Sequence, residues 1–245
     1  DSYYENVRSD LIPLIPFDAK CILEVGCAAG MTGQELKKRS GVFVAGIELN
    51  AKAAEVAKTV LDDVVQGSIE DIDLPYSDRS FDCILFADVL EHLVDPLSAL
   101  IRVRRLLKKG GTVVASIPNV QFHGVIHKLI EGNWTYEKEG ILDETHLRFF
   151  TYKEIVKLFN QAGYSIEAVE EVLDPQYEKL SSMNSTAINF GRTKIKDLTP
   201  EEIKRFFVFQ YKIVVSPTNV NRNKVDNMSD NGETVSQIDQ LMLEA

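Results

Sequence analysis

Short β-branched runs alternate with longer amphipathic segments up to about residue 172, and this alternation restricts the fold more than any other feature. Five runs predict strands buried on both faces: residues 21–25, 42–47, 64–66, 81–86 and 112–117. Apolar spacings of three and four predict helices over residues 31–40, 51–61 and 96–107. Such repeats form parallel sheets flanked by helices. We therefore expect the α/β class with a doubly wound, mostly parallel sheet.

Helix start signals extend this pattern toward the end of the chain. Thr151 to Glu154 reads as a capping box, and Gly163 is a natural stop for the helix that it opens. Thr199-Pro200 predicts a short helix that leads into a late strand over residues 206–215. Between residues 174 and 198 the periodicity fades, so we expect a loop or small insertion there.

Length and composition predict one folded domain. The chain has 245 residues, of which 44% are hydrophobic and 26% charged. We assign residues 1–216 to this domain, with a lid insertion at about 120–150, and residues 217–245 to a polar tail that offers a contact for a second copy. The net charge of -10 disfavours nucleic acid and anionic membranes as partners. No apolar run is long enough to span a bilayer, so we expect a cytoplasmic protein.

The cysteine and histidine spacings predict neither a disulfide framework nor a metal site. Three cysteines occur without a CxxC pair, and two lie in apolar strand-like runs. His123 and His127 lie four residues apart, on one helical face, but no third ligand accompanies them.

The turn after the first strand has the small residues that a ligand needs to approach the backbone. It runs through Glu24, Gly26, Cys27, Ala28 and Gly30. A dinucleotide fold needs a further glycine where Ala28 stands, so that backbone amides can cradle a pyrophosphate. A carboxylate two residues before the turn suits a cationic ligand instead.

Three further segments follow predicted strands and meet this turn at one sheet edge. Glu48 ends the second strand, where an acid can accept both hydroxyls of a ribose. Ser68 follows the third strand and Asp88 the fourth. In open α/β sheets ligands bind at the carboxyl ends of the strands. The sequence therefore predicts a nucleoside with a positively charged, phosphate-free tail.

With these motifs, residues 3–172 resemble the class I S-adenosylmethionine-dependent methyltransferases. The matching segments are Glu24 to Gly30, Glu48, Ser68-Ile69, Asp88 to Leu93 with Asp95-Pro96, and Leu107 to Gly111. The resemblance implies a seven-stranded Rossmann-like sheet whose last strand is antiparallel, and S-adenosylmethionine as the cofactor. It implies an adenine contact at Ser68-Ile69 and a cofactor site that extends to Leu49, Ala87 and Asp88.

Two positions depart from the family pattern. Ala28 replaces the middle glycine of the turn, which is acceptable if its φ is negative. Ser68 stands where an aspartate is common, and it keeps a hydroxyl without the charge.

Within the family, residues 117–120 and 140–151 resemble a subgroup found near or fused to glycosyltransferases in polysaccharide pathways. This resemblance implies a sugar or similar small hydroxylated acceptor, and Trp134 and Tyr136 are candidates to stack on it or merely to pack. A quinone-like phenol, a tRNA and a non-catalytic cofactor-binding module stay open as alternatives. A nicotinamide dehydrogenase is disfavoured by Glu24 and the absent glycine.

A hydroxyl acceptor is a poor nucleophile at neutral pH, so methyl transfer gains from a general base. His146 is the preferred candidate because it lies with Arg148 in the acceptor-side segment. His92 follows the fourth strand and is the second candidate.

Overall fold

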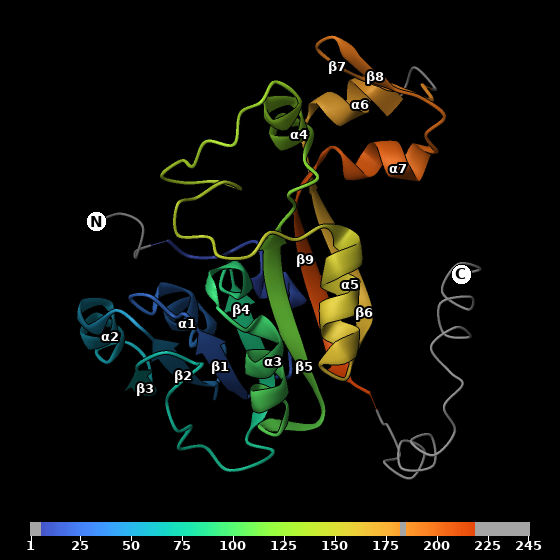
Figure 1. The fold of residues 1–245 in the computed structure, drawn as a ribbon. Coiled ribbons are helices and arrows are strands. Elements are labelled where there is room, and N and C mark those ends of the chain that lie inside the picture. Colours follow the sequence, from blue (N-terminus) through green and yellow to red (C-terminus); the bar gives the residue numbers. More distant parts are fainter. Residues whose placement is uncertain (1–5, 182–184, 219–245) are drawn as a thin grey trace, which may run out of the picture.

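The computed structural model describes residues 6–181 and 185–218, which form a twisted sheet with helices on both sides (Figure 1). Seven strands lie in the order β3-β2-β1-β4-β5-β9-β6. Their bounds are β1 Cys21–Val25, β2 Phe43–Glu48, β3 Asp63–Gln66, β4 Phe81–Ala87, β5 Leu107–Pro118, β6 Tyr164–Leu173 and β9 Val208–Pro217. Strands β1 to β5 are parallel, and β9 runs antiparallel between β5 and β6. The predicted α/β class and seven-stranded, mostly parallel sheet are confirmed.

The sheet is buried on both faces because its strands alternate their side chains between two apolar clusters. In β4, Ile84 and Phe86 join the larger cluster, whereas Cys83 and Leu85 join the smaller one. The larger cluster includes residues of α3 and α5, and the smaller includes residues of α1 and α2. This arrangement explains why the strand sequences read as continuous apolar runs.

The helices are α1 Met31–Leu36, α2 Ala51–Ala57, α3 Pro96–Arg104, α4 His123–Ile130, α5 Tyr152–Gln161, α6 Gln176–Ser181 and α7 Pro200–Arg205, with 3-10 turns at η2 Ile12–Leu14 and η3 Leu90–His92. Helices α1, α2 and α3 begin where the sequence predicts and end earlier, whereas no bounds were predicted for α4 and α6. Helix α3 stops before the predicted residue 107 because Leu107 already pairs with Phe81 in the sheet. Thr199 forms the full reciprocal capping box, while the Thr151 hydroxyl accepts from the Glu154 amide at 3.5 Å.

Two insertions lie beyond the carboxyl ends of the parallel strands. The first leaves β5 and contains α4, at the top of Figure 1. The second, predicted as a loop or small insertion, contains α6 and the hairpin of β7 Ile188–Phe190 and β8 Thr193–Ile195. Strand β9 includes Pro217, the first residue of the predicted tail, and residues 219–245 lie outside the described part of the chain. No helix among the described residues is both long and apolar enough to cross a membrane.

Asn119 fixes the point at which the chain leaves β5 for the first insertion. Its side chain is fully buried, and its Nδ2 donates to the carbonyls of Arg205 and Val208 at 2.9 and 2.8 Å. Its Oδ1 accepts from the Gln121 amide at 3.0 Å. The insertion is thus held to β9 by a side chain whose polar atoms are all paired.

Replacing Asn119 should destabilise the fold because the carbonyls of Arg205 and Val208 lose the side-chain donor that Asn119 supplies. For Asn119→Ala we expect the free energy of unfolding to fall by about 1 to 3 kcal/mol. Urea unfolding followed by circular dichroism measures this, with Gln121→Ala as the matched neighbour. Equal stability of the two variants would contradict the anchoring role of Asn119.

Candidate functional site

The turn between β1 and α1 has left-handed backbone at three positions. Gly26 and Gly30 have φ of 70° and 80°. A Cβ on Gly26 would lie 2.6 Å from Cγ2 of Val89, so only glycine fits there. Ala28 has a φ of 49°, and the negative φ on which its acceptance depended is not found. A left-handed alanine costs about 1–2 kcal/mol, and the hydrogen bond from its amide to Glu48 offsets part of this strain.

Four backbone amides of the turn already have a partner within the protein. The amides of Gly26 and Cys27 donate to the Ile47 carbonyl at 2.8 and 3.1 Å, and the Gly30 amide donates to Cys27 at 2.8 Å. The Ala28 amide donates to Oε2 of Glu48 at 2.8 Å. A phosphate-binding turn needs free amides, so this one is built for a ligand without phosphate.

Glu48 joins the turn to the start of α2. Its Oε1 accepts from the Asn50 amide at 2.7 Å, and its Oε2 accepts from Ala28. The residue is 7% exposed. Each carboxylate oxygen has a second lone pair, so the pair of hydroxyls of a ribose can still be accepted.

Glu24 is a buried carboxyl that the fold alone does not explain. It is 2% exposed, and its Oε2 has no hydrogen-bond partner. Burial raises the pKa of Glu24 to about 8. Hydrogen bonds from the Gly33 amide and the Thr32 hydroxyl lower this pKa, but they do not offset the effect of burial. A buried carboxyl with one unpaired oxygen beneath a ligand-binding turn fits a cationic group of that ligand.

The remaining predicted cofactor residues surround the same edge. Ser68 accepts from the Glu70 amide at 3.1 Å, and Ile69 is buried in the core. Leu49 is exposed beside Glu48, and Ala87 ends β4 with a half-buried side chain. The structure brings all of these to the carboxyl ends of β1 to β4.

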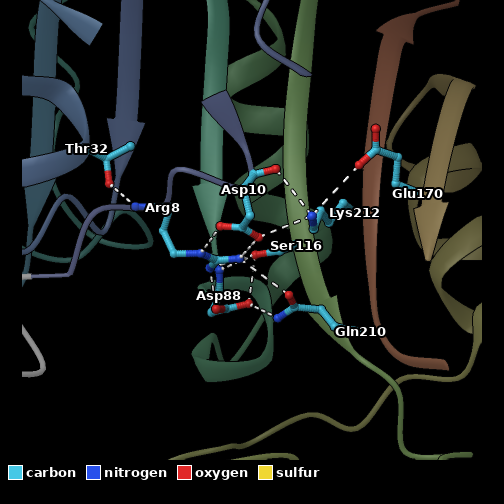
Figure 2. A network of polar contacts seen from close by, with 8 residues as sticks. All are labelled: Arg8, Asp10, Thr32, Asp88, Ser116, Glu170, Gln210 and Lys212. Carbon is cyan, nitrogen blue, oxygen red and sulfur yellow. Dashed lines mark hydrogen bonds and ion pairs between the residues drawn. The ribbon is translucent and has the colours of Figure 1, made fainter. Parts of the chain in front are cut away.

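Arg8 lies at the centre of a polar network across the ends of β4, β5 and β9 (Figure 2). Its guanidinium contacts Asp88, pairs with both oxygens of Asp10 at 3.0 and 3.1 Å, and donates to Ser116 at 3.2 Å. Gln210 donates to Asp88 at 2.6 Å. The backbone amide of Arg8 donates to the Thr32 hydroxyl at 3.1 Å, which places the main chain of Arg8 beside the turn.

No sequence motif marks Arg8, because its contacts cross the edge of the sheet and do not depend on local spacing. Burial lowers the pKa of Arg8, but its bond with Asp10 and the charge of Asp88 outweigh this and raise it. Asp88 itself has a left-handed φ of 55°, and its amide donates to Ser116 at 3.0 Å. Arg8 and Asp88 therefore form an ion pair at this edge of the sheet.

The two predicted catalytic histidines lie together with a third residue. The rings of His92 and His146 have centroids 4.7 Å apart. Glu91, His92 and His146 each offer a ligand atom, and these atoms lie within 4.8 Å of one another. Burial, with the charge of Asp88, raises the pKa of Glu91 well above its ordinary value. Burial and the neighbouring His146 lower the pKa of His92. We call these three residues the Glu91 cluster.

The predicted acceptor residues do not all join this cluster. Arg148 is exposed and its guanidinium donates to the Val94 carbonyl. Trp134 and Tyr136 are exposed and flank Phe149, with ring centroids 5.2 and 6.3 Å from it. Trp134 and Phe149 also line a hollow of about 710 Å³ between α4, the start of α5 and α7, and Tyr136 does not.

His123 and His127 do not form a pair. His123 Nε2 lies 3.2 Å from Asp174, whereas His127 Nε2 lies 3.5 Å from Glu131. The two rings therefore contact different acids.

Comparison with known sequences matches this chain to methyltransferases. A family profile described as a methyltransferase domain matches residues 2–169. The ubiquinone biosynthesis O-methyltransferase of Aromatoleum aromaticum is 25% identical over 181 residues, 70% of this chain and 75% of that protein. The protein of the same name from Cereibacter sphaeroides is 28% identical over 162 residues, 63% of this chain and 64% of that protein.

Solved structures share the fold at low identity. A methyltransferase from Thermotoga maritima, described as a possible histamine N-methyltransferase, has a TM-score of 0.56 and 21% identity, covering 84% of both chains. The [4+2]-cyclase SpnF has a TM-score of 0.55 and 17% identity, covering 85% of this chain and 80% of that one.

Glu24 should give the ligand-free protein a characteristic pH dependence. Because its folded pKa of about 8 lies above the ordinary 4.5, the folded state binds an extra proton between these values. The free energy of unfolding should fall as pH rises through this window, by roughly 1 kcal/mol per pH unit from this group. In Glu24→Gln this contribution should vanish. Urea unfolding of both proteins from about pH 5 to 8 measures the difference, and parallel curves would refute the raised pKa.

Proposed function

Because the chain belongs to the class I S-adenosylmethionine-dependent methyltransferases, we propose that it methylates a hydroxyl of a small acceptor, with a sugar as the leading class. The observation that carries this proposal is the turn after β1. Four of its amides are engaged within the protein, while a buried Glu24 with one unpaired oxygen and a bridging Glu48 lie beside it. This combination fits a cationic nucleoside without phosphate.

The residues at the crevice fit S-adenosylmethionine group by group. Glu48 would accept the ribose hydroxyls, and Ser68 and Ile69 would lie at the adenine. Arg8 and Asp88 carry charges that complement the carboxylate and ammonium of the methionyl tail. When bound, S-adenosylmethionine supplies a methyl group on a positively charged sulfur.

The Glu91 cluster is the proposed receiver of the acceptor proton. Nδ1 of His146 donates to the Ile141 carbonyl at 3.0 Å, which leaves Nε2 as its proton-accepting atom. His146 is 8% exposed and lies against His92. Positioning of the acceptor hydroxyl against the methyl group supplies the rest of the rate enhancement.

The insertion after β5 has features that support each of two acceptor classes. Exposed Trp134 and Tyr136 offer flat faces on which a sugar ring can stack, which supports the sugar. The hollow that Trp134 lines is mostly apolar, and the curated relatives described above are named for ubiquinone biosynthesis, so a phenol with an apolar substituent is the second candidate.

Binding measurements test the cofactor assignment directly. We expect S-adenosylmethionine and its demethylated product to bind with micromolar dissociation constants in calorimetry, and NAD not to bind. Glu48→Ala should weaken binding by about 1 to 3 kcal/mol, because the ribose hydroxyls lose their acceptor and the turn its brace. Glu55→Ala, an exposed acid of α2, is the control. Binding of NAD alone would overturn the assignment.

Turnover tests the acceptor and the cluster. A panel of sugars and of phenols with apolar substituents, assayed for methyl transfer from labelled S-adenosylmethionine, separates the two classes. With the accepted substrate, His146→Ala should lower kcat about 100-fold or more and leave cofactor affinity unchanged. His127→Ala, in an exposed ion pair, is the control. Full turnover by His146→Ala would remove it from the chemistry, and cofactor binding without transfer to any acceptor would favour a non-catalytic module.

A further inference from the structure

Glu91 is buried without any partner for its carboxyl group. The residue is 1% exposed, and neither Oε1 nor Oε2 has a hydrogen-bond partner in the described structure. Its main chain is firmly held, since the Glu91 carbonyl accepts from the amides of Leu147 and Arg148 at 2.8 and 2.9 Å. Burying an unsatisfied carboxyl is costly, so the side chain is retained for something that the protein alone does not supply.

The two imidazoles beside Glu91 are held in the tautomer that leaves Nε2 available to a metal ion. Nδ1 of His146 donates to the Ile141 carbonyl at 3.0 Å, and Nδ1 of His92 donates to the Thr145 carbonyl at 3.2 Å. A carbonyl oxygen only accepts, so both protons lie on Nδ1 and both Nε2 atoms carry a lone pair. A metal-binding histidine characteristically donates its other ring nitrogen to a carbonyl or carboxylate.

A further set of contacts, from Thr145 and Asp143, fixes the orientation of the His92 ring. The Thr145 hydroxyl lies 3.1 Å from Nδ1 of His92 and donates to Oδ1 of Asp143 at 2.6 Å. Since that hydroxyl gives its proton to Asp143, its oxygen accepts from His92. A carboxylate therefore orients the ring through a hydroxyl, as second-sphere residues do at metal centres.

From these contacts we propose that Glu91, His92 and His146 form a site for one divalent transition-metal ion, with zinc as the best match. The three ligand atoms lie within 4.8 Å of one another. Metal bonds of about 2.0–2.2 Å require spacings somewhat shorter than this, which small side-chain rotations supply. Two imidazoles and one carboxylate favour zinc or its first-row neighbours over magnesium or calcium, which prefer oxygen ligands.

Three protein ligands leave a coordination position open, as catalytic zinc sites do. The role of that position rests on the proposed function: the acceptor hydroxyl would occupy it. With the ion bound, Nε2 of His146 is a ligand and no longer a proton acceptor, so the ion would take over the activation of the hydroxyl. It would lower the pKa of the hydroxyl, whose proton would pass to solvent. The acceptor oxygen then forms a bond to the methyl carbon as the carbon–sulfur bond breaks. That electron pair stays on sulfur, which becomes a neutral thioether.

Metal titration of tag-free protein, dialysed first against a chelator, tests the site without any activity. We expect one zinc ion per chain in calorimetry with zinc chloride. With cobalt chloride we expect visible absorption bands of a low-symmetry site. In Glu91→Gln, His92→Ala and His146→Ala the dissociation constant for zinc should rise by about 100-fold or more.

His127→Ala and Glu139→Gln are the matched controls, because His127 is half-buried, Glu139 is exposed, and both lie outside the cluster. Glu91→Gln is a near-isosteric change, and cooperative urea unfolding shows whether each variant is folded. His92 is only half-buried, so His92→Ala provides a second folded test. Wild-type zinc affinity in the folded cluster variants, or no stoichiometric binding by the wild type, would overturn the site.

Calorimetry with the demethylated cofactor separates this inference from the proposed function. Cofactor binding by a wild type that binds no zinc overturns the metal site alone. Stoichiometric zinc binding without cofactor binding leaves the site in place and overturns the proposed function.

Discussion

The carboxylate of Glu48 connects the two loops on which the crevice depends. One oxygen holds the Ala28 amide and the other holds the Asn50 amide, so the turn after β1 and the start of α2 are fixed to each other. Ala28 keeps its left-handed backbone under this restraint. The parallel register of β1 and β2 makes the bridge possible, because it brings Val25 level with Ile47. Neighbouring parallel strands thus bring residues 20 apart in sequence into direct contact at one edge of the sheet.

The alternation of strands and helices predicts much of the architecture, because buried parallel strands must be apolar on both faces. The site residues that follow strands were predictable for the same reason: chain order in a parallel sheet determines the edge at which they meet. Strand β6 was not separately predicted, and its burial pattern explains why. Most of its residues are half-buried or exposed, so its sequence lacks a long apolar run.

Long-range side-chain contacts were beyond prediction. Arg8 meets Ser116 and Gln210 from positions 108 and 202 residues away, and no local pattern marks such a meeting. The Glu91 cluster combines two residues of η3, which follows β4, with His146 from the insertion, more than fifty residues later. The sequence identified both histidines as candidates, but only the structure shows that they share a site and that the unpaired carboxyl of Glu91 lies close to both.

The insertion after β5 is attached to the cluster through its main chain. Leu147 and Arg148 both donate their amides to the Glu91 carbonyl, and the Val120 amide donates to Phe150. Any residue except proline can donate such a hydrogen bond from its backbone amide. The side chains around Trp134 and Tyr136 can therefore change through evolution while the Glu91 cluster stays in place. Under the proposed function, this separates the residues that select an acceptor from those that activate it, so relatives can diverge in what they modify and keep the same activating residues.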